Sequence, residues 1–258
     1  HLQLPAGGGG AALAAGGLHP VCNIYSSFMQ RAYDNIIHDV ALQRLPVTLC
    51  IDRAGIVGED GATHHGSFDL AYLSCIPDII VAAPMNELEL RNMLYTAVNT
   101  PSPYAIRYPR GCGEGVEWRG VPFETIPTGK GRRLKDGKNM AVITIGTAGN
   151  LAAEAIERIE SRYPVTIAHY DLRFAKPLDE ALLREAARFD RILTVEDGIL
   201  RGGVGEAVAK FFSDNGLTPH VRSLGIDDKF VEHGTVAQLQ AICGYDADGI
   251  ERTIKEML

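Results

Sequence analysis

Residues 46–66 read Pro46-Val-Thr-Leu-Cys-Ile51 and then Asp52-Arg-Ala-Gly-Ile-Val-Gly-Glu-Asp-Gly-Ala-Thr-His-His-Gly66. The first part is an apolar run of strand length, and the second is a long loop rich in glycine and charge. In an open parallel sheet, ligands bind beyond the carboxyl ends of the strands. A buried strand that runs into such a loop therefore indicates an α/β fold with a site at this strand end.

Apolar runs and helical patterns alternate on both sides of this stretch. The first half has predicted strands at 20–25, 46–51, 78–83 and 104–108, and predicted helices at 28–42, 68–73 and from Asn86 onward. The second half has predicted strands at 141–145, 165–170, 191–195 and 220–224, and predicted helices at 150–159, 178–187, 204–212, 236–242 and 250–258. This alternation predicts parallel sheets with helices on their faces.

The length of 258 residues suits two domains. We predict a first domain over 18–115, a linker rich in glycine and proline over 116–139 with an edge hairpin at 129–134, and a second domain over 140–258. Residues 1–17 contain four consecutive glycines, and we expect them to be irregular because glycine loses the most backbone entropy on ordering. No strand precedes these glycines, which disfavours a phosphate-binding loop.

The amino-acid composition argues against several classes of function. A net charge of −7, from 32 acidic and 25 basic residues, argues against a nucleic-acid partner. No apolar run approaches the ~18 residues of a membrane span. The cysteines are odd in number, widely spaced and without a CxxC pair, which disfavours a disulfide framework or a zinc site and favours reduced thiols in the cytoplasm. They are Cys22, Cys50, Cys75, Cys112 and Cys243.

The loop at 52–66 combines carboxylates with two adjacent histidines, His64 and His65. A carboxylate such as Asp60 near an imidazole can make a proton shuttle that works near neutral pH. The alternatives are a purely structural loop and a metal site. Adjacent histidines point apart, and HxH and HxxxH spacings are absent, so acid/base chemistry is preferred over a metal.

Two further patterns in the first half carry candidate binding residues. Phe28 and Arg31 are three positions apart and share a helix face, where Phe28 could stack on a flat heteroaromatic ring, although periodicity alone favours a core role. Arg53, Arg107 and Arg110 are candidates for a phosphate clamp because the guanidinium fork matches phosphate oxygens. Each arginine taken alone is more often part of a surface ion pair.

In the second half, Glu196-Asp-Gly198 ends a predicted strand and Gly202-Gly-Val-Gly205 opens a predicted helix. Amides at such a helix start can bind an anion. The spacing only loosely follows GxGxxG, and no acidic residue ends a strand ~20 residues later, so tight packing at a domain interface is favoured. The polar segment 227–234 is a further candidate for a domain interface.

Six motifs together resemble 1-deoxy-D-xylulose-5-phosphate synthases, a thiamine-diphosphate-dependent, transketolase-like family. The resemblance covers about residues 18–258. Transketolases and the β subunits of 2-oxoacid dehydrogenases share the architecture but lack the sequence motif DRAGIVGxDGxTHxG. The motifs are Asn23-Ile-Tyr-Ser-Ser-Phe-Met-Gln-Arg-Ala-Tyr-Asp34, Asp52-Arg-Ala-Gly-Ile-Val-Gly-Glu-Asp-Gly-Ala-Thr-His64, Arg107-Tyr-Pro-Arg-Gly111, Ala175-Lys-Pro-Leu-Asp179, Thr194-Val-Glu-Asp-Gly198 and Phe230-Val-Glu-His-Gly234.

The resemblance implies a pyrimidine-binding-type parallel-sheet domain followed by a transketolase C-terminal-type α/β domain. It implies an enzyme that decarboxylates pyruvate and joins the two-carbon unit to glyceraldehyde 3-phosphate, using thiamine diphosphate and Mg²⁺. It also implies a cytoplasmic homodimer. Carried over by motif, Phe28 would stack on the aminopyrimidine ring of the cofactor, and Arg31 would line the same site.

The same resemblance assigns the substrate side of the site. His64 and Asp60 would bind substrate and assist proton transfers, and Tyr25, Arg53 and Arg110 would hold the phosphate of the aldehyde.

Two departures from the family pattern stand beside these matches. The family's glutamate in a GIAEQHA run, which bonds the pyrimidine, falls on Gln3, and no GDG motif for Mg²⁺ occurs in the sequence. We therefore expect a C-terminal two-domain fragment without its own metal site and without activity alone. The alternatives are a non-catalytic dimerisation module and a β subunit of a 2-oxoacid dehydrogenase.

Overall fold

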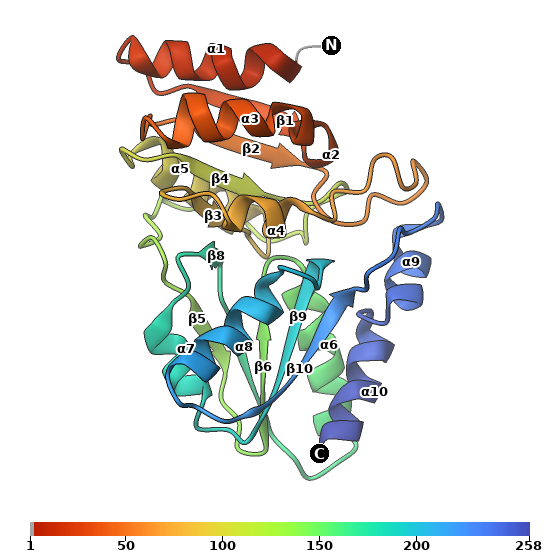
Figure 1. Cartoon of the computed structure of the whole chain (residues 1–258). Coiled ribbons are helices and arrows are strands. Elements are labelled where there is room, and N and C mark those ends of the chain that lie inside the picture. Colours follow the sequence, from red (N-terminus) through yellow and green to blue (C-terminus); the bar gives the residue numbers. More distant parts are fainter. Residues whose placement is uncertain (1–2) are drawn as a thin grey trace.

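The chain forms two α/β units, each built on a five-stranded sheet; the first is the upper and the second the lower unit in Figure 1. The computed structural model describes residues 3–258. The first sheet has the order β1-β2-β4-β3-β8 and the second the order β10-β9-β6-β7-β5. All neighbours are parallel except β8 against β3 and β5 against β7. The strands are β1 Val21–Tyr25, β2 Thr48–Asp52, β3 Ile80–Ala82, β4 Tyr104–Arg107, β5 Arg132–Lys135, β6 Met140–Thr144, β7 Ile167–Asp171, β8 Phe174–Lys176, β9 Arg191–Ile199 and β10 His220–Ile226.

Helices cover both faces of each sheet, which explains why the central strands are apolar along their whole length. On the first sheet, α5 packs Met93 and Ala97 against Tyr104 and Ile106 of β4. The helices are α1 Gln3–Ala15, α2 Ser26–Met29, η1 Gln30–Ala32, α3 Tyr33–Asn35, η2 Ile36–Ala41, α4 Asp69–Ser74, α5 Glu87–Val98, α6 Ala148–Glu160, α7 Glu180–Ala186, α8 Val204–Asp214, α9 Val236–Cys243 and α10 Ala247–Met257. No helix among the described residues has the length and apolar character needed to cross a membrane.

The N-terminal stretch differs from the irregular terminus expected for residues 1–17. Gln3–Ala15 forms α1, which lies along the outer side of the first unit (Figure 1). Ala11 and Ala14 are buried in the same core as Ile24 of β1. At Gly10, an added Cβ would lie 2.7 Å from the Cys22 sulfur. Close packing against the sheet edge therefore orders a glycine run that backbone entropy alone would leave irregular.

Two other elements depart from the sequence prediction. The helix expected over 28–42 is a helical stretch from Ser26 to Ala41 that changes from α through 3₁₀ to π geometry. The hairpin expected at 129–134 is a single edge strand, β5, which pairs with β7 from a distant part of the chain. Local sequence cannot specify this partner, because β7 begins more than thirty residues later.

Strand β8 was not predicted, and it joins the two units. Phe174–Lys176 leaves the second half of the chain and pairs antiparallel with β3 at the edge of the first sheet. Beside this crossing, Arg132 contacts Glu89 at 2.9 Å and Asp171 at 3.1 Å, while Arg173 contacts Glu89 at 2.7 Å. The two units therefore share a strand pairing and a cluster of buried carboxylates.

Candidate active site

The predicted site residues come from three neighbouring parallel strands. Tyr25 ends β1, Asp52 ends β2, and Arg107 ends β4, in the sheet order β1-β2-β4. Phe28 follows β1 on α2, and Arg110 follows β4. The carboxyl ends of adjacent parallel strands meet at one sheet edge, which is where open α/β sheets bind ligands.

Three aromatic rings lie together at this edge. The rings of Tyr25 and Phe28 are stacked, with centroids 5.3 Å apart and planes inclined by 14°. Phe28 and His64 meet edge to face at 5.3 Å. Phe28 is half-buried and also packs against the core, as periodicity alone predicts, and its role as a ligand-stacking residue stays a prediction. The structure brings together residues that are 39 positions apart in sequence, from Tyr25 to His64.

Two guanidinium groups lie in this region, Arg53 against an aromatic ring and Arg110 on the neighbouring loop. The guanidinium carbon of Arg53 lies 3.8 Å above the Tyr25 ring, and Arg53 also forms an ion pair with Asp52. Its φ of 56° is unusual for a residue other than glycine. Arg110 donates to the Val57 carbonyl at 3.1 Å and lies 3.8 Å from a carboxylate oxygen of Asp60.

Arg31 is exposed on η1 and makes no hydrogen bond or ion pair with another described residue. Arg107, the third candidate for a phosphate clamp, is buried and has a structural role instead. It contacts Asp69 at 3.1 Å and donates to the Asp197 carbonyl at 2.7 Å. Its guanidinium is buried and bonded through Nε and Nη2 to the protein itself, so the interpretation of Arg107 as a phosphate ligand is wrong.

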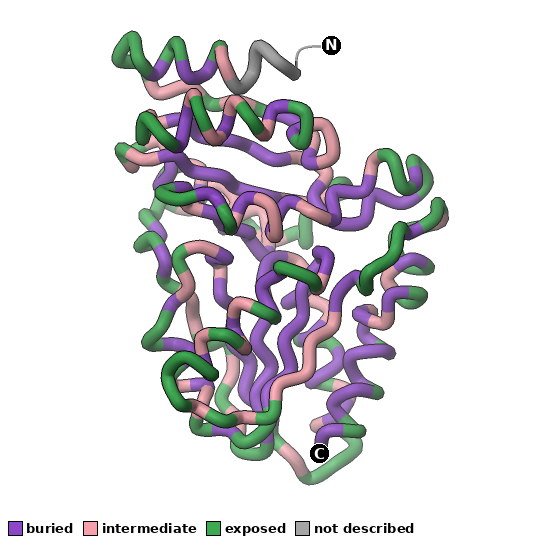
Figure 2. The backbone as a smooth tube through the Cα atoms, viewed as in Figure 1, coloured by how far each residue is buried: buried purple, intermediate pink, exposed green. Residues whose placement is uncertain are grey.

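The loop that carries Arg53 and His64 is closed at its base by its own backbone. Gly55 and Gly66 exchange two hydrogen bonds, of 2.8 and 2.7 Å. At Gly66, an added Cβ would lie 2.4 Å from the Arg53 carbonyl oxygen, so only glycine fits there. Figure 2 shows the stems of this loop buried, while Glu59 and Asp60 at its tip are exposed.

Asp197 of β9 holds the start of this loop from the second unit, a role that sequence reasoning missed. Its carboxylate accepts from the Ile56 amide at 3.2 Å and from the Tyr245 hydroxyl at 2.6 Å. Burial raises the pKa of Asp197. Gly55 permits this contact, because an added Cβ would lie 1.7 Å from the Asp197 carboxylate. The sequence signal for this role is the position of Asp197, a polar residue just beyond the end of a predicted strand.

The glycine-rich start of α8 does not offer its amides to a ligand. The Glu196 carboxylate accepts from the Val204 amide at 2.9 Å and from the Gly205 amide at 2.8 Å. Burial raises the pKa of Glu196 to about 7. The preference for packing over anion binding at this turn is therefore confirmed.

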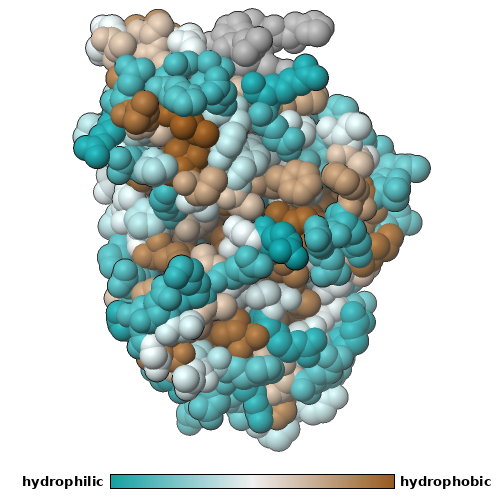
Figure 3. Space-filling model, viewed as in Figure 1, coloured by the Kyte–Doolittle hydropathy of each residue, from teal (hydrophilic) through white to brown (hydrophobic). Residues whose placement is uncertain are grey.

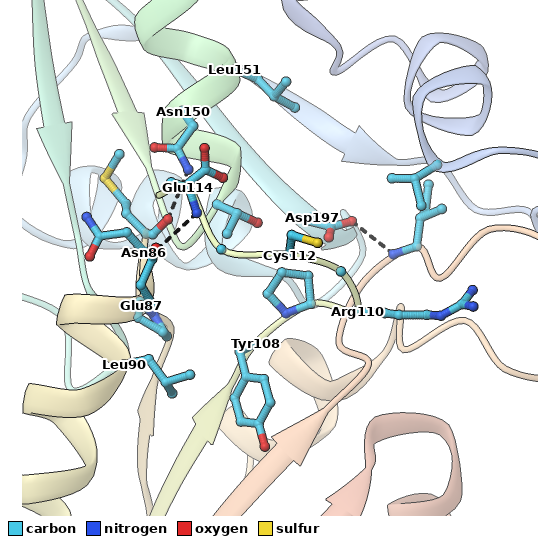
Figure 4. A pocket seen from close by; sticks show the side chains of 18 of the residues that line it. Asn86, Glu87, Leu90, Tyr108, Arg110, Cys112, Glu114, Asn150, Leu151 and Asp197 are labelled. Atoms are coloured by element: carbon cyan, nitrogen blue, oxygen red, sulfur yellow. Dashed lines mark hydrogen bonds between the residues drawn. The ribbon is translucent and has the colours of Figure 1, made fainter. Parts of the chain in front are cut away.

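A cavity of about 920 Å³ opens between the two units and reaches the site. Arg53, Tyr108, Arg110 and Asp197 are among the residues that line it. Figure 4 shows Tyr108, Arg110 and Cys112 on the segment that follows β4, with Asp197 near Cys112 in this view. The cavity gives a small molecule access to the side of the loop that carries the guanidinium groups.

The geometry suits a flat heteroaromatic ring better than a metal ion. The stacked rings of Tyr25 and Phe28 provide an aromatic surface at the ligand-binding edge of the sheet. No group of three or more histidines, cysteines, aspartates or glutamates arranged to hold a metal ion occurs within residues 3–258.

Comparison with known families covers most of the chain. Residues 6–114 match the family "Transketolase, pyrimidine binding domain" and residues 129–250 match "Transketolase, C-terminal domain". The chain therefore belongs to the transketolase family, as a pyrimidine-binding domain followed by a C-terminal domain.

Within this family, the chain is similar to 1-deoxy-D-xylulose-5-phosphate synthases. It is 59% identical to that of Bacteroides thetaiotaomicron over 244 residues, covering 94% of this chain and 38% of that protein. It is 46% identical to that of Aquifex aeolicus over 249 residues, covering 96% and 39%. The chain thus spans less than half the length of these curated relatives.

Solved structures show the same architecture. A protein described as "Split gene transketolase, inactive beta4 tetramer" superposes with a TM-score of 0.87 at 26% identity, covering 99% of this chain and 82% of that one. The transketolase of Campylobacter jejuni superposes with a TM-score of 0.75 at 18% identity, covering 96% and 37%. The expected pair of α/β domains is confirmed, with one antiparallel edge strand in each sheet.

Proposed function

We propose that this chain forms the pyrimidine side and the aldehyde-phosphate side of a 1-deoxy-D-xylulose-5-phosphate synthase. The observation that carries this proposal is the cluster of Tyr25, Phe28 and His64 with Arg53 against the Tyr25 ring, and Arg110 lining the same cavity as Arg53. It combines a stacking surface, an imidazole and two cations at the ligand-binding edge of the sheet. Curated relatives of that name, 46–59% identical over almost the whole chain, support the same activity.

The reaction would decarboxylate pyruvate and join its remaining two carbons to glyceraldehyde 3-phosphate. When bound, thiamine diphosphate supplies the electron sink that lets pyruvate lose its carboxyl group as CO₂. Phe28 would stack on the pyrimidine ring. Arg31, exposed on the next helical turn, would line the entrance of the site.

The aldehyde substrate would bind against the guanidinium groups. Arg53 and Arg110 would hold its phosphate, with the Tyr25 hydroxyl as a further donor. The Asp60–Arg110 pair is half-exposed and so costs little to rearrange when a phosphate arrives. His64 would move protons at the substrate oxygens, with Asp60 as a second polar contact.

The groups that hold Mg²⁺ and the diphosphate would come from outside the described residues, and the chain alone would not catalyse the reaction.

The protein would act as a cytoplasmic homodimer. Exposed apolar side chains around the first unit support self-association, and hydrophobic surface is visible over this unit in Figure 3. They include Leu13, Leu18, Val21 and Leu42.

A fused enzyme tests the proposed activity. The part of the Bacteroides thetaiotaomicron synthase that matches this chain, 38% of its length, is replaced by this chain. The fused protein should form 1-deoxy-D-xylulose 5-phosphate from pyruvate and glyceraldehyde 3-phosphate, and should not transfer two-carbon units between sugar phosphates as a transketolase does. A folded fused protein without synthase activity would refute the proposal.

A second candidate function follows from the split-gene neighbour. That protein is similar over 99% of this chain and is described as an inactive tetramer. The corresponding proposal is a chain that becomes active only with a separate partner chain. Mixing this chain with the remaining N-terminal part of the Bacteroides synthase, expressed separately, should then restore synthase activity without covalent fusion.

A further inference from the structure

His65 joins the loop of the candidate site to the second α/β unit. The side chain is buried, at 4% exposure. Its Nδ1 atom lies 3.1 Å from the Val57 amide, which belongs to the same loop, and its Nε2 atom lies 3.0 Å from the Glu232 carbonyl oxygen of the second unit. In Figure 1, this loop and the segment that precedes α9 lie side by side, at the right of the view.

These two partners determine where the imidazole carries its proton. A backbone amide only donates, so Nδ1 must be unprotonated to accept from Val57. A backbone carbonyl only accepts, so Nε2 must carry the hydrogen that it donates to Glu232. The neutral Nε2–H tautomer satisfies both partners, whereas the doubly protonated imidazolium loses the bond from Val57.

Neighbouring contacts show that the loop is fitted closely to the second unit at this point. An added Cβ at Gly58 would lie 3.2 Å from the Gly234 carbonyl oxygen, and one at Gly61 would lie 3.3 Å from the His233 Cβ. On the far side of the loop, Asp197 accepts from the Ile56 amide. The loop is therefore fastened to the second unit at two places, through Asp197 and through His65.

We propose that neutral His65 is a positioning residue, which fastens the loop carrying Arg53, Asp60 and His64 to the segment 227–234 of the second unit. The consequence for catalysis rests on the proposed function, but the fastening itself does not.

Other titratable groups surround this imidazole and must be distinguished from it. His64 and Asp60 lie on the same loop, and Glu232, His233 and Asp197 lie on the second unit. Among these, His65 is the group whose protonation removes a hydrogen-bond acceptor from the Val57 amide. Replacing His65 by a side chain that does not titrate therefore separates its contribution from theirs.

Amide hydrogen exchange of the 258-residue chain, measured by NMR near pH 7.5, tests the fastening. In His65→Ala, the Val57 amide should exchange at least about tenfold faster than in the wild type, because it loses its hydrogen-bond acceptor. His65→Gln should retain most of the protection, because its amide group can both accept from Val57 and donate to Glu232. His64→Ala is the matched control, and it should leave the exchange of the Val57 amide unchanged.

The tautomer provides a second, independent readout. Nitrogen-15 shifts of the wild-type imidazole should show hydrogen on Nε2, a measurement that holds even if His65→Ala fails to fold. Hydrogen on Nδ1, or exchange equal to the wild type in His65→Ala, would overturn the proposal. Neither readout needs cofactor or activity, so failure of the proposed function leaves both results interpretable.

Discussion

At the residue scale, the site depends on side chains whose neighbours are fixed by the sheet. Sequence motifs identified Tyr25, Phe28 and His64 as candidates, and the structure places their rings in contact. Asp197 could not be assigned this way, because its partner Ile56 lies 141 positions away. Arg107 was interpreted wrongly for a related reason: nothing in the local sequence shows that Asp69 neutralises it.

The imidazole of His64 is the group we expect to move protons in the reaction. In the fused enzyme, His64→Ala should lower product formation by about tenfold or more, because positioned acid/base groups contribute about 10²–10⁴-fold. Steady-state rates with saturating pyruvate and aldehyde measure this effect. His220→Ala, which changes an exposed histidine at the start of β10, is the control and should keep the wild-type rate. A wild-type rate in His64→Ala would exclude the role.

The buried Glu196 carboxyl should make stability depend on pH. Burial raises its pKa from 4.5 to about 7 in the folded protein. Between about pH 4.5 and 7, the unfolded chain loses this proton while the folded chain keeps it, so the free energy of unfolding falls as the pH rises. Urea unfolding at several pH values should show a shallower fall in Glu196→Gln, and no change in slope for the exposed control Glu157→Gln. An unchanged slope in Glu196→Gln would contradict the raised pKa.

At the element scale, the periodic strands and helices followed from sequence, and the elements that depend on distant partners did not. The helix predicted from Asn86 onward is α5, and the Asn86 side chain caps it by accepting from the Glu89 amide at 2.9 Å. In contrast, the local sequences of α1 and β8 show no clear helix or strand pattern. Packing in the core orders α1, and pairing with β3 orders β8. Local patterns specify amphipathic elements, whereas an edge strand of three residues has too few side chains to show alternation.

Two neighbouring glycines of α1 should respond in opposite ways to substitution. Gly9 is exposed, and an added Cβ has no atom within 4 Å, so Gly9→Ala should stabilise the protein by about 0.5–1 kcal/mol through helix propensity. Gly10 packs against Cys22 and Val47, so Gly10→Leu should destabilise it by about 1–3 kcal/mol. Urea unfolding compares the two variants. Equal effects would mean that α1 does not pack against the sheet as described.

At the scale of the whole molecule, a buried charge cluster and β8 tie the two units together. Burial and the neighbouring Glu89 raise the pKa of Asp171 to about 7, in spite of Arg132. The two-domain organisation was predicted from sequence, but this tie was not, because its members come from four separate segments. We expect the two units to unfold in one cooperative transition.

Arg132 and Arg133 provide a matched test of this tie. Arg132→Ala leaves the buried Glu89 and Asp171 without their shared cation and should destabilise the protein by about 3 kcal/mol. Arg133 pairs with exposed carboxylates, and Arg133→Ala should cost less than about 1 kcal/mol. Calorimetry of thermal unfolding measures both, and Arg132→Ala should also separate the single transition into two. Equal costs for the two variants would show that the cluster does not join the units.

We propose that this chain provides the surface on which the pyrimidine ring of thiamine diphosphate stacks. Isothermal titration of the fused enzyme with thiamine diphosphate and Mg²⁺ tests it most directly. Phe28→Ala should weaken binding by about tenfold, as expected for the loss of one aromatic stacking contact, and this chain alone should show no micromolar binding. Unchanged affinity in Phe28→Ala, or micromolar affinity of the chain alone, would contradict the account.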